Sequence, residues 1–364
     1  MIPVLARPYV STGYQMIDEM EIRNFRCFEH LKAKCKRFNI IVGESGAGKT
    51  ALLEALFLTL AGNLEVGVRL KQQRGFDTRY SGHPGSIEAA IWRDYFYDMD
   101  WARVISIILS GSGSGARSLS ISRGPTETLL PLSGEKDSPP SSSLPLEFNW
   151  RDAYGRTFSL SPKVIEQGGQ FPSSMEHLPD FFLFPASQVT PASENAARFS
   201  DLSIEGNENK IVEIFKREYP WITGLDVQVI GGSPIIYASI EGQKRKLPLN
   251  AVSGGINRFI SIMLALACRP QSVILVDEIE DGLYHRHKAA NWRGMLSLGR
   301  ETDAQMFLTT HDEEWLEAVV TTGGEDVSDI ALWRVERTKD NQRILRQFSG
   351  DTFRASVETG GEVR

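Results

Sequence analysis

Short hydrophobic runs, separated by polar and glycine-rich turns, recur along this chain and predict alternating strands and helices. The runs at 37–42, 181–185 and 273–276 are short and mainly apolar, which is typical of buried strands. The run at 51–60 is longer, and it predicts an apolar helix. Apolar residues at helical spacing predict another helix at 210–219. Further strands are predicted at 86–92, 102–109, 146–150, 157–160, 225–230, 234–240, 305–310 and 328–335.

Three segments stand apart from this pattern. Residues 19–28 alternate enough to predict an edge strand that runs into a turn. Residues 110–145 are rich in Ser, Gly and Pro, a composition that predicts long loops with no core of their own. Residues 1–15 differ in character from the rest of the chain and are predicted to form a flexible N-terminal extension. Met1 and Met16 both stay open as the natural start.

A glycine-rich stretch lies between the predicted strand at 37–42 and the predicted helix at 51–60. It reads Gly43-Glu44-Ser45-Gly46-Ala47-Gly48-Lys49-Thr50 and matches G-x-x-x-x-G-K-[ST], the phosphate-binding P-loop. Glycines let the backbone fold around phosphates without Cβ clashes, so that N–H groups and the helix start face the anion. Lys49 is expected to reach the β- and γ-phosphates, and Thr50 to bind Mg²⁺.

Two acidic residues come directly after the apolar strand at 273–276 and give the Walker B pattern. Asp277 is expected to hold Mg²⁺ through water, and Glu278 to polarise the attacking water. Strands often end in acidic residues by chance, so the pattern gains its weight from its place between two further motifs, one at 253–255 and one at 311.

Two further patterns lie on either side of these acids. Ser253, Gly254 and Gly255 open an apolar helix, and such a helix start favours anion binding, although small residues often begin helices. The strand at 305–310 leads directly into His311. A histidine at the end of a strand is usually structural, and the order of the patterns is what makes His311 a candidate site residue.

Composition narrows the classes of protein without choosing one. The chain has 364 residues, with 40 Lys plus Arg against 46 Asp plus Glu, so its formal net charge is −6. This acidity argues against a generally basic nucleic-acid coat, but it leaves room for a local basic patch such as 244–246. Cys27, Cys35 and Cys268 show no zinc spacing and fit a reducing cytoplasm. The sequence contains neither a signal pattern nor a membrane-length apolar run, so we expect a cytoplasmic protein without a membrane partner.

Taken in order, these motifs resemble the OLD (overcoming lysogenization defect), RecF and SMC type of ABC ATPase. The resemblance is carried by Asn24-Phe25-Arg26-Cys27-Phe28, the P-loop, the Ser253 motif, the run Asp277-Glu278-Ile279-Glu280-Asp281-Gly282-Leu283-Tyr284-His285 and His311. It implies an α/β P-loop NTPase of the ABC-ATPase head type, with two lobes, a mixed sheet and an antiparallel β subdomain. The first lobe would span 16–200, with the insertion near 110–145, the second lobe 201–348, and a polar tail 349–364.

The resemblance also implies roles for the residues of these motifs. Gly43, Ser45, Gly46, Ala47, Gly48, Lys49 and Thr50 would bind ATP, and Thr50 and Asp277 would hold Mg²⁺. Glu278 and His311 would be catalytic, with His311 at the γ-phosphate. Ser253, Gly254 and Gly255 match the ABC signature, which in this family binds ATP held by a partner subunit. A family glutamine would help to hold Mg²⁺, and both Gln72 and Gln73 are candidates. At three positions this chain has a residue that is uncommon in the family, namely Ile256, Tyr284 and Asp312.

The resemblance further implies a slow ATPase that acts as a homodimer or a higher homo-oligomer. No Toprim or HNH nuclease motif is visible, so we expect a stand-alone ATPase subunit. It would control a separately encoded effector, such as a Toprim or HNH nuclease, as similar ATPases do in anti-phage systems such as PARIS and Septu. The alternative is a RecF-like repair or replication factor that binds DNA directly. The sequence leaves the effector, its trigger and any DNA preference open.

Overall fold

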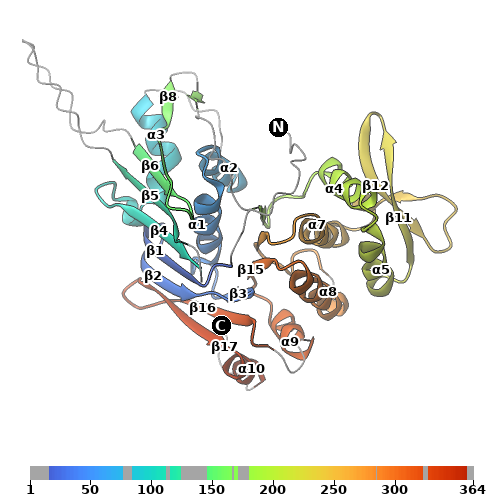
Figure 1. The fold of residues 1–364 in the computed structure, drawn as a ribbon. Coiled ribbons are helices and arrows are strands. Elements are labelled where there is room, and N and C mark those ends of the chain that lie inside the picture. The colour runs from blue at the N-terminus through green and yellow to red at the C-terminus, as the bar shows by residue number, and fades with distance from the viewer. Residues whose placement is uncertain are drawn as a thin grey trace, which may run out of the picture.

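The computed structural model of the chain describes residues 16–76, 84–111, 115–123, 146–165, 168–170, 180–283, 285–322 and 327–358. Its centre is a six-stranded sheet in which the strand before the P-loop, β3, lies between β15 and β16 (Figure 1). Five strands run parallel, and β17 pairs antiparallel with β16 at one edge. In sheet order, the strands are β10 (Phe181–Phe184), β14 (Val273–Val276), β15 (Gln305–Thr309), β3 (Phe38–Val42), β16 (Ile330–Arg337) and β17 (Arg343–Ser349).

The central strands are short and apolar because both of their faces are covered. Every residue of β3, β14 and β15 is buried. Alternate side chains of β3 belong to two different cores, with Ile41 in one and Ile40 and Val42 in the other. This is the arrangement expected of a parallel sheet with layers packed on both sides. The predicted strands at 37–42, 181–185, 273–276 and 305–310 are confirmed.

The first core contains helix α1 (Lys49–Ala61), which comes after the P-loop and lies between the central sheet and a second, antiparallel sheet (Figure 1). Every residue from Ala51 to Ala61 is buried, so the helix has no polar face. The antiparallel sheet contains, in spatial order, β2 (Phe28–Lys34), β1 (Glu19–Phe25), β4 (Ile105–Ser110), β5 (Arg117–Arg123), β6 (Leu146–Arg151) and β7 (Thr157–Leu160). Mixed and antiparallel sheets with helical layers confirm the predicted α/β class.

The second core lies on the other face of the central sheet and is built mainly by helices α7, α8 and α9. Beyond them, α4 and α5 pack against a three-stranded sheet (Figure 1). Within the described residues, the elements of this half are α4 (Ala192–Ile204), α5 (Glu208–Glu218), β11 (Ile222–Ile230), β12 (Ser233–Ile240), β13 (Leu247–Pro248), α6 (Leu249–Val252), α7 (Gly254–Cys268), η3 (His285–His287), α8 (Lys288–Glu301), α9 (Glu313–Thr322) and α10 (Asp351–Glu358).

Several predictions from the sequence differ from the structure. Residues 86–92 form the end of helix α3 (Pro84–Trp92), where the sequence predicts a strand. Strand β1 is not an edge strand, because it pairs with both β2 and β4. Residues 117–123 lie in the predicted loop region, yet they form β5 in the middle of the antiparallel sheet, with Leu119 and Ile121 fully buried. The rest of that region, at 112–114 and 124–145, lies outside the described residues, as does 1–15.

The end of the chain also differs from the predicted polar tail. Strand β16 is followed by β17 and then by helix α10, where the sequence predicts a last strand at 328–335 and a tail from 349. Phe353 of α10 is fully buried in the second core, and this contact explains why the helix is part of the fold. The central sheet also combines β3 and β10 with strands from the second half of the chain. The division of the chain into lobes at residue 200 stays a prediction.

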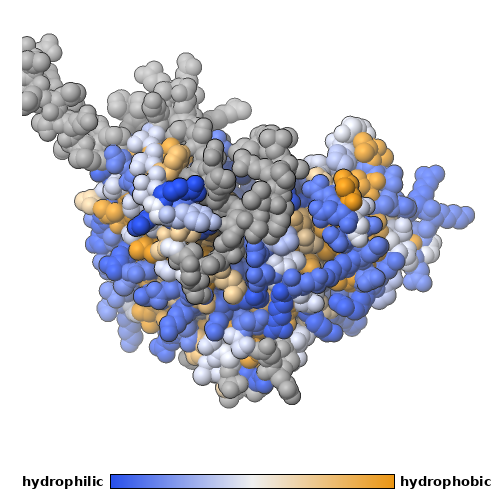
Figure 2. Space-filling model, in the orientation of Figure 1, coloured by the Kyte–Doolittle hydropathy of each residue, from blue (hydrophilic) through white to orange (hydrophobic). Residues whose placement is uncertain are grey.

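The remaining short elements lie beside the antiparallel sheet or near its end. They are α2 (Glu65–Gln73), η1 (Arg93–Tyr95), η2 (Tyr97–Met99), β8 (Lys163–Ile165) and β9 (Gly168–Gln170). The face shown in Figure 2 is mostly hydrophilic, with hydrophobic residues scattered singly or in small groups. In the part of the chain that the structure describes, none of the helices combines the length and the apolar character that crossing a bilayer requires.

A buried ion network ties the first strands to α1. Arg26, in the turn after β1, donates from Nε to Glu54 Oε2 of α1 at 3.1 Å. It also pairs with Asp94 of η1, which accepts from Lys71 of α2 as well. The Arg26 and Glu54 side chains are only 8% and 3% exposed. Burial alone would lower the pKa of Arg26, but the carboxylates of Glu54 and Asp94 outweigh it, and the pKa is raised. These pairs join the turn after β1, η1 and α2 to the P-loop helix.

We expect Glu54→Ala to lower the free energy of unfolding by about 3–5 kcal/mol, because it leaves the buried Arg26 guanidinium without its main partner. Urea denaturation measures this loss. Glu29→Ala is the matched control, because Glu29 pairs with Arg103 at 3.0 Å where both side chains are more than a third exposed. Its cost should stay below about 1 kcal/mol. Equal costs for the two variants would contradict a structural role for the network.

Candidate nucleotide-binding site

Three glycines shape the loop between β3 and α1, each for its own reason. Gly43 has φ +148°, and a Cβ there would lie 2.3 Å from the Val335 carbonyl oxygen. Gly48 has φ +116°, and a Cβ there would lie 2.6 Å from Cys27 Sγ. Gly46 has φ +75° with open space around it. Positive φ and close backbone approach are the two conditions that favour glycine, so the loop has the shape that the motif predicts.

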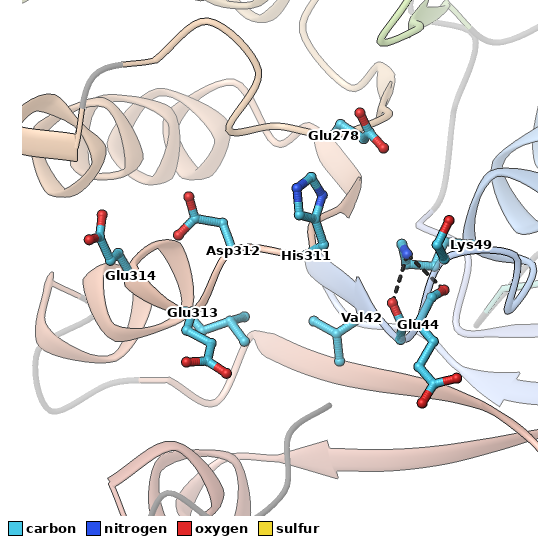
Figure 3. A pocket seen from close by; sticks show the side chains of 11 residues that line it. Val42, Glu44, Lys49, Glu278, His311, Asp312, Glu313 and Glu314 are labelled. Atoms are coloured by element: carbon cyan, nitrogen blue, oxygen red, sulfur yellow. Dashed lines mark hydrogen bonds between the residues drawn. The ribbon is translucent and has the colours of Figure 1, made fainter.

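Lys49, the first residue of α1, folds its side chain back over this loop. Its Nζ donates to the carbonyl oxygens of Gly43 at 2.7 Å and Glu44 at 3.2 Å (Figure 3). Burial lowers the pKa of Lys49, and the carboxylates of Glu278 and Asp277 oppose that shift. The ammonium group therefore stands at the mouth of the loop, close to where a bound phosphate would need a cation.

Thr50 and Asp277 come together from opposite halves of the chain. The Thr50 hydroxyl lies 3.1 and 3.0 Å from the two carboxylate oxygens of Asp277, at the end of β14. The Thr309 hydroxyl, at the end of β15, donates to Asp277 Oδ1 at 2.6 Å. Hydroxyl and carboxylate oxygens are hard ligands, and Mg²⁺ in nucleotide sites uses one or two such protein groups together with phosphates and water. The donor set therefore fits Mg²⁺.

Glu278 comes directly after Asp277 and has a left-handed conformation, with φ +50°. Its backbone N–H donates to the Thr309 hydroxyl at 2.8 Å, so this one hydroxyl holds the positions of both acidic residues. A left-handed non-glycine residue is unusual and is frequent at functional sites. Here the conformation turns the Glu278 carboxylate out of the strand and toward the P-loop.

His311 lies just beyond the end of β15, on the wall of a cavity of about 750 Å³ (Figure 3). Its side chain is 62% exposed, and Nδ1 lies 2.7 Å from Glu280 Oε1. The imidazole lies on the same side of the cavity as Glu278 and Lys49 (Figure 3). The cavity is lined by Val42, Gly43, Glu44, Ser45, Lys49, Glu278, His311, Asp312, Glu313, Glu314 and Leu316.

Two more cavities adjoin the P-loop. One, of about 630 Å³, shares Ser45, Lys49 and Glu278 with the first cavity and extends to Arg26 and Phe96. A smaller one, of about 250 Å³, is lined by Thr50 and Asp277 together with Gln73. Of the two candidate glutamines, Gln73 is thus the one beside the Thr50–Asp277 pair.

The motif Ser253, Gly254 and Gly255 lies at the start of α7, apart from these cavities. Ser253 Oγ accepts the Ile256 N–H at 3.5 Å, a long cap. A Cβ on Gly255 would lie 1.8 Å from the Gly282 carbonyl oxygen, so two backbones cross there in direct contact. None of the three residues lines the P-loop cavities formed by the described residues. The structure therefore joins the P-loop, the two acids and His311, and leaves the Ser253 motif elsewhere.

Arg258, in the first turns of α7, holds the loops that come after β10 and β14. It donates from Nη1 to the Pro185 carbonyl oxygen at 3.0 Å and from Nη2 to the Glu278 carbonyl oxygen at 3.3 Å. Nη2 also bonds the Asp277 carbonyl oxygen. Burial lowers the pKa of Arg258, and nearby carboxylates such as Asp281 oppose that shift. Sequence reasoning missed this residue, and its only signal was a cation early in an apolar helix.

Arg343 of β17 contacts the P-loop from the far end of the chain. Its Nε donates to the Ala47 carbonyl oxygen at 3.1 Å, and Nη2 to the Gly46 carbonyl oxygen at 3.5 Å. In a trans peptide the N–H of the next residue points the opposite way from the carbonyl. Arg343 therefore holds the Gly48 N–H on the other side of the loop. No local pattern around 343 predicts this contact.

The chain is similar to several known proteins. A family described as "AAA ATPase domain" matches residues 16–79. A relative from Helicobacter pylori (strain ATCC 700392 / 26695), called ATP/GTP phosphatase, is 21% identical in an alignment 327 residues long, which covers 83% of this chain and 87% of the relative. An SmcHead bound to the C-winged helix domain of ScpA has a TM-score of 0.49 at 14% identity, covering 92% of this chain and 98% of that one. An Smc head with an extended coiled coil, bound to ScpA derived from Pyrococcus furiosus, has a TM-score of 0.48 at 13% identity, covering 96% and 99%.

The fold and the loop define a P-loop ATPase, a class that hydrolyses ATP. A second family, described as "AAA domain, putative AbiEii toxin, Type IV TA system", matches residues 118–317, more than half of the chain. The chain belongs to this family.

We expect Gly255→Ala to lower the free energy of unfolding by about 1–3 kcal/mol, because the new methyl group overlaps the Gly282 carbonyl oxygen. Gly254→Ala is the matched control, since a Cβ there meets nothing within 4 Å, and it should change stability by less than about 0.5 kcal/mol. Thermal and urea unfolding of the two variants make the comparison. Equal free energies of unfolding for Gly254→Ala and Gly255→Ala would contradict the close contact between the backbones of Gly255 and Gly282.

We expect Arg343→Ala to weaken ATP binding about tenfold, the effect of losing roughly 1.4 kcal/mol from a charged hydrogen bond that orients the loop. Isothermal titration calorimetry with a non-hydrolysed ATP analogue measures the dissociation constant. Arg346→Ala, on the same strand and paired with Glu336 where it is 62% exposed, is the control and should bind normally. Equal binding by both variants would show that Arg343 does not support the P-loop.

Proposed function

We propose that this ATPase binds ATP with Mg²⁺ beside the P-loop and hydrolyses it within a head-to-tail homodimer. The N–H groups of Ser45, Gly46, Ala47 and Gly48 would bind the phosphates, with Gly43 setting the entry to the loop. The Lys49 ammonium neutralises the β- and γ-phosphates. The oxygens of Thr50 and Asp277 would hold Mg²⁺, which would neutralise charge that develops on the phosphate oxygens.

Glu278 and His311 complete the proposed reaction site. The Glu278 carboxylate reaches both larger cavities, so it stands where it can accept a hydrogen bond from the water that attacks the γ-phosphate. His311, on the wall shared with Lys49, contacts the γ-phosphate from the other side. Phosphoryl transfer gains most from positioning and charge stabilisation, and this site supplies both.

The position of Ser253, Gly254 and Gly255 carries the dimer proposal. These residues form a helix start suited to an anion, yet they line none of the P-loop cavities within the described part of the chain. A second copy, turned head to tail, could place this motif over the γ-phosphate. ATP would then stabilise the dimer, and hydrolysis would release it, as a shift between two populations.

We further propose that this cycle controls a separately encoded effector protein in bacterial anti-phage defence. The description of the family supports this, since it names a toxin of a toxin–antitoxin system, the kind of arrangement in which a second gene product matters. A nuclease of the Toprim or HNH type is the effector that the OLD-like resemblance favours. Direct DNA binding of the RecF kind is the competing function.

We expect Glu278→Gln to retain ATP and to form a stable dimer or larger assembly, because it keeps the binding groups and removes the carboxylate that activates water. Size-exclusion chromatography with light scattering, with ATP and Mg²⁺, measures the mass. Glu278→Gln combined with Lys49→Ala should stay monomeric. A third variant, Glu278→Gln with Ser253→Arg, should bind ATP but not assemble.

The same chromatography experiment tests whether the assembly binds an effector protein. The product of the adjacent gene should co-elute with the Glu278→Gln assembly and leave it when ATP is omitted. Capture of duplex DNA by the assembly alone, lost with rising salt, would instead support the RecF-like function. A mass that does not respond to nucleotide in any variant would contradict the composite site.

A further inference from the structure

Glu280 makes two hydrogen bonds with one oxygen, and both go to His311. The His311 backbone N–H donates to Glu280 Oε1 at 2.9 Å, and His311 Nδ1 lies 2.7 Å from the same atom. The Glu280 side chain is 8% exposed, whereas the histidine side chain is 62% exposed. A nearly buried carboxylate thus holds one edge of an exposed imidazole.

The contact with Glu280 determines which nitrogen of the His311 ring carries the hydrogen. A carboxylate has only acceptor atoms, so Nδ1 of His311 must carry the hydrogen that joins it to Glu280. Nε2 is then the ring nitrogen left to meet a ligand, and His311 lines the same cavity as Lys49 and Glu278 (Figure 3). In the neutral ring, the hydrogen bond to Nδ1 thereby assigns the tautomer.

The backbone around Glu280 is held from several directions. The Ile279 N–H donates to the Thr309 carbonyl oxygen at 3.0 Å, and the Ile279 side chain is fully buried. The N–H groups of Asp281 and Leu283 close turns onto the carbonyl oxygens of Glu278 and Glu280 at 3.0 and 2.9 Å. Glu280 therefore has little freedom to leave His311.

The second oxygen of Glu280 points to the same role. Oε2 is buried and has no hydrogen-bond partner among the described residues. A buried polar atom without a partner costs stability, and such a cost is usually kept for a functional reason. If the only role of Glu280 were to stabilise the fold, a side chain with one acceptor atom could accept the hydrogen bonds of His311. It would do so without burying a second, unpaired oxygen.

We propose that Glu280 is a positioning residue for ATP hydrolysis, which holds His311 with Nδ1 protonated and Nε2 toward the γ-phosphate. The inference rests on the proposed role of His311. It assigns to Glu280 the task that a carboxylate performs behind a catalytic or metal-bound histidine elsewhere, where loss of the orienting group typically costs about 10- to 100-fold in activity or metal affinity.

The test combines measurements of ATP turnover with a spectroscopic measurement of the His311 tautomer. We expect Glu280→Ala to lower kcat about 10- to 100-fold with KM for ATP nearly unchanged. Glu280→Gln keeps an oxygen acceptor for Nδ1 and should recover most of the activity. Glu280→Ala should cost nothing further when it is added to His311→Ala. Asp281→Asn, an exposed neighbour in the same loop, is the control and should turn over normally.

Long-range ¹H–¹⁵N correlation spectra of histidine-labelled protein report the tautomer, with the His311 signals identified by their loss in His311→Ala. We expect Nδ1–H in the wild type and Nε2–H in Glu280→Ala. Nε2–H in the wild type would overturn the proposal, even if the alanine variant fails to fold. Normal turnover by His311→Ala would instead contradict the proposed function. If His311→Ala loses turnover while Glu280→Ala turns over normally, the role of Glu280 is overturned and the proposed function is not.

Discussion

One hydroxyl group joins the parts of this site. Thr309 donates to the Asp277 carboxylate and accepts the N–H of Glu278, while Asp277 lies against Thr50 of the P-loop helix. The parallel pairing of β14, β15 and β3 brings these strand ends to one edge of the sheet. Because the carboxyl ends of parallel strands meet there, residues far apart in sequence become neighbours. A shift of any one strand would separate Asp277 and Glu278 from Thr309 or from Thr50.

The negative charge of the site is a second constraint on how it can bind a nucleotide. Asp277, Glu278 and Glu280 gather within a few residues of one another, opposite a single P-loop lysine. Such a site repels a phosphate chain unless cations and N–H groups compensate, which is why Mg²⁺ belongs to the proposed chemistry. Arg258 and Arg343 act differently, since they bond backbone carbonyl oxygens and so hold the loops in place.

The sequence predicts what is local and fails where distant segments meet. The glycines at 43, 46 and 48 predict the P-loop because the positive φ angles belong to the loop itself. Asp277, Glu278 and His311 come after apolar runs, so their place at strand ends is visible in the sequence. No local sequence pattern predicts the contacts of Thr309, Glu280 and Arg343, because these residues bond to segments that are distant in the sequence. Residues 86–92 show the ambiguity of short apolar runs, whose period fits a strand and a helix equally well.

The burial of α1 has a mechanical consequence. A helix with one polar face can slide or turn on its support, but α1 is enclosed between two sheets along its length. Close-packed interiors do not deform smoothly, so the P-loop cannot move relative to either sheet without breaking both contacts. Any displacement of α1 would therefore have to carry both sheets with it.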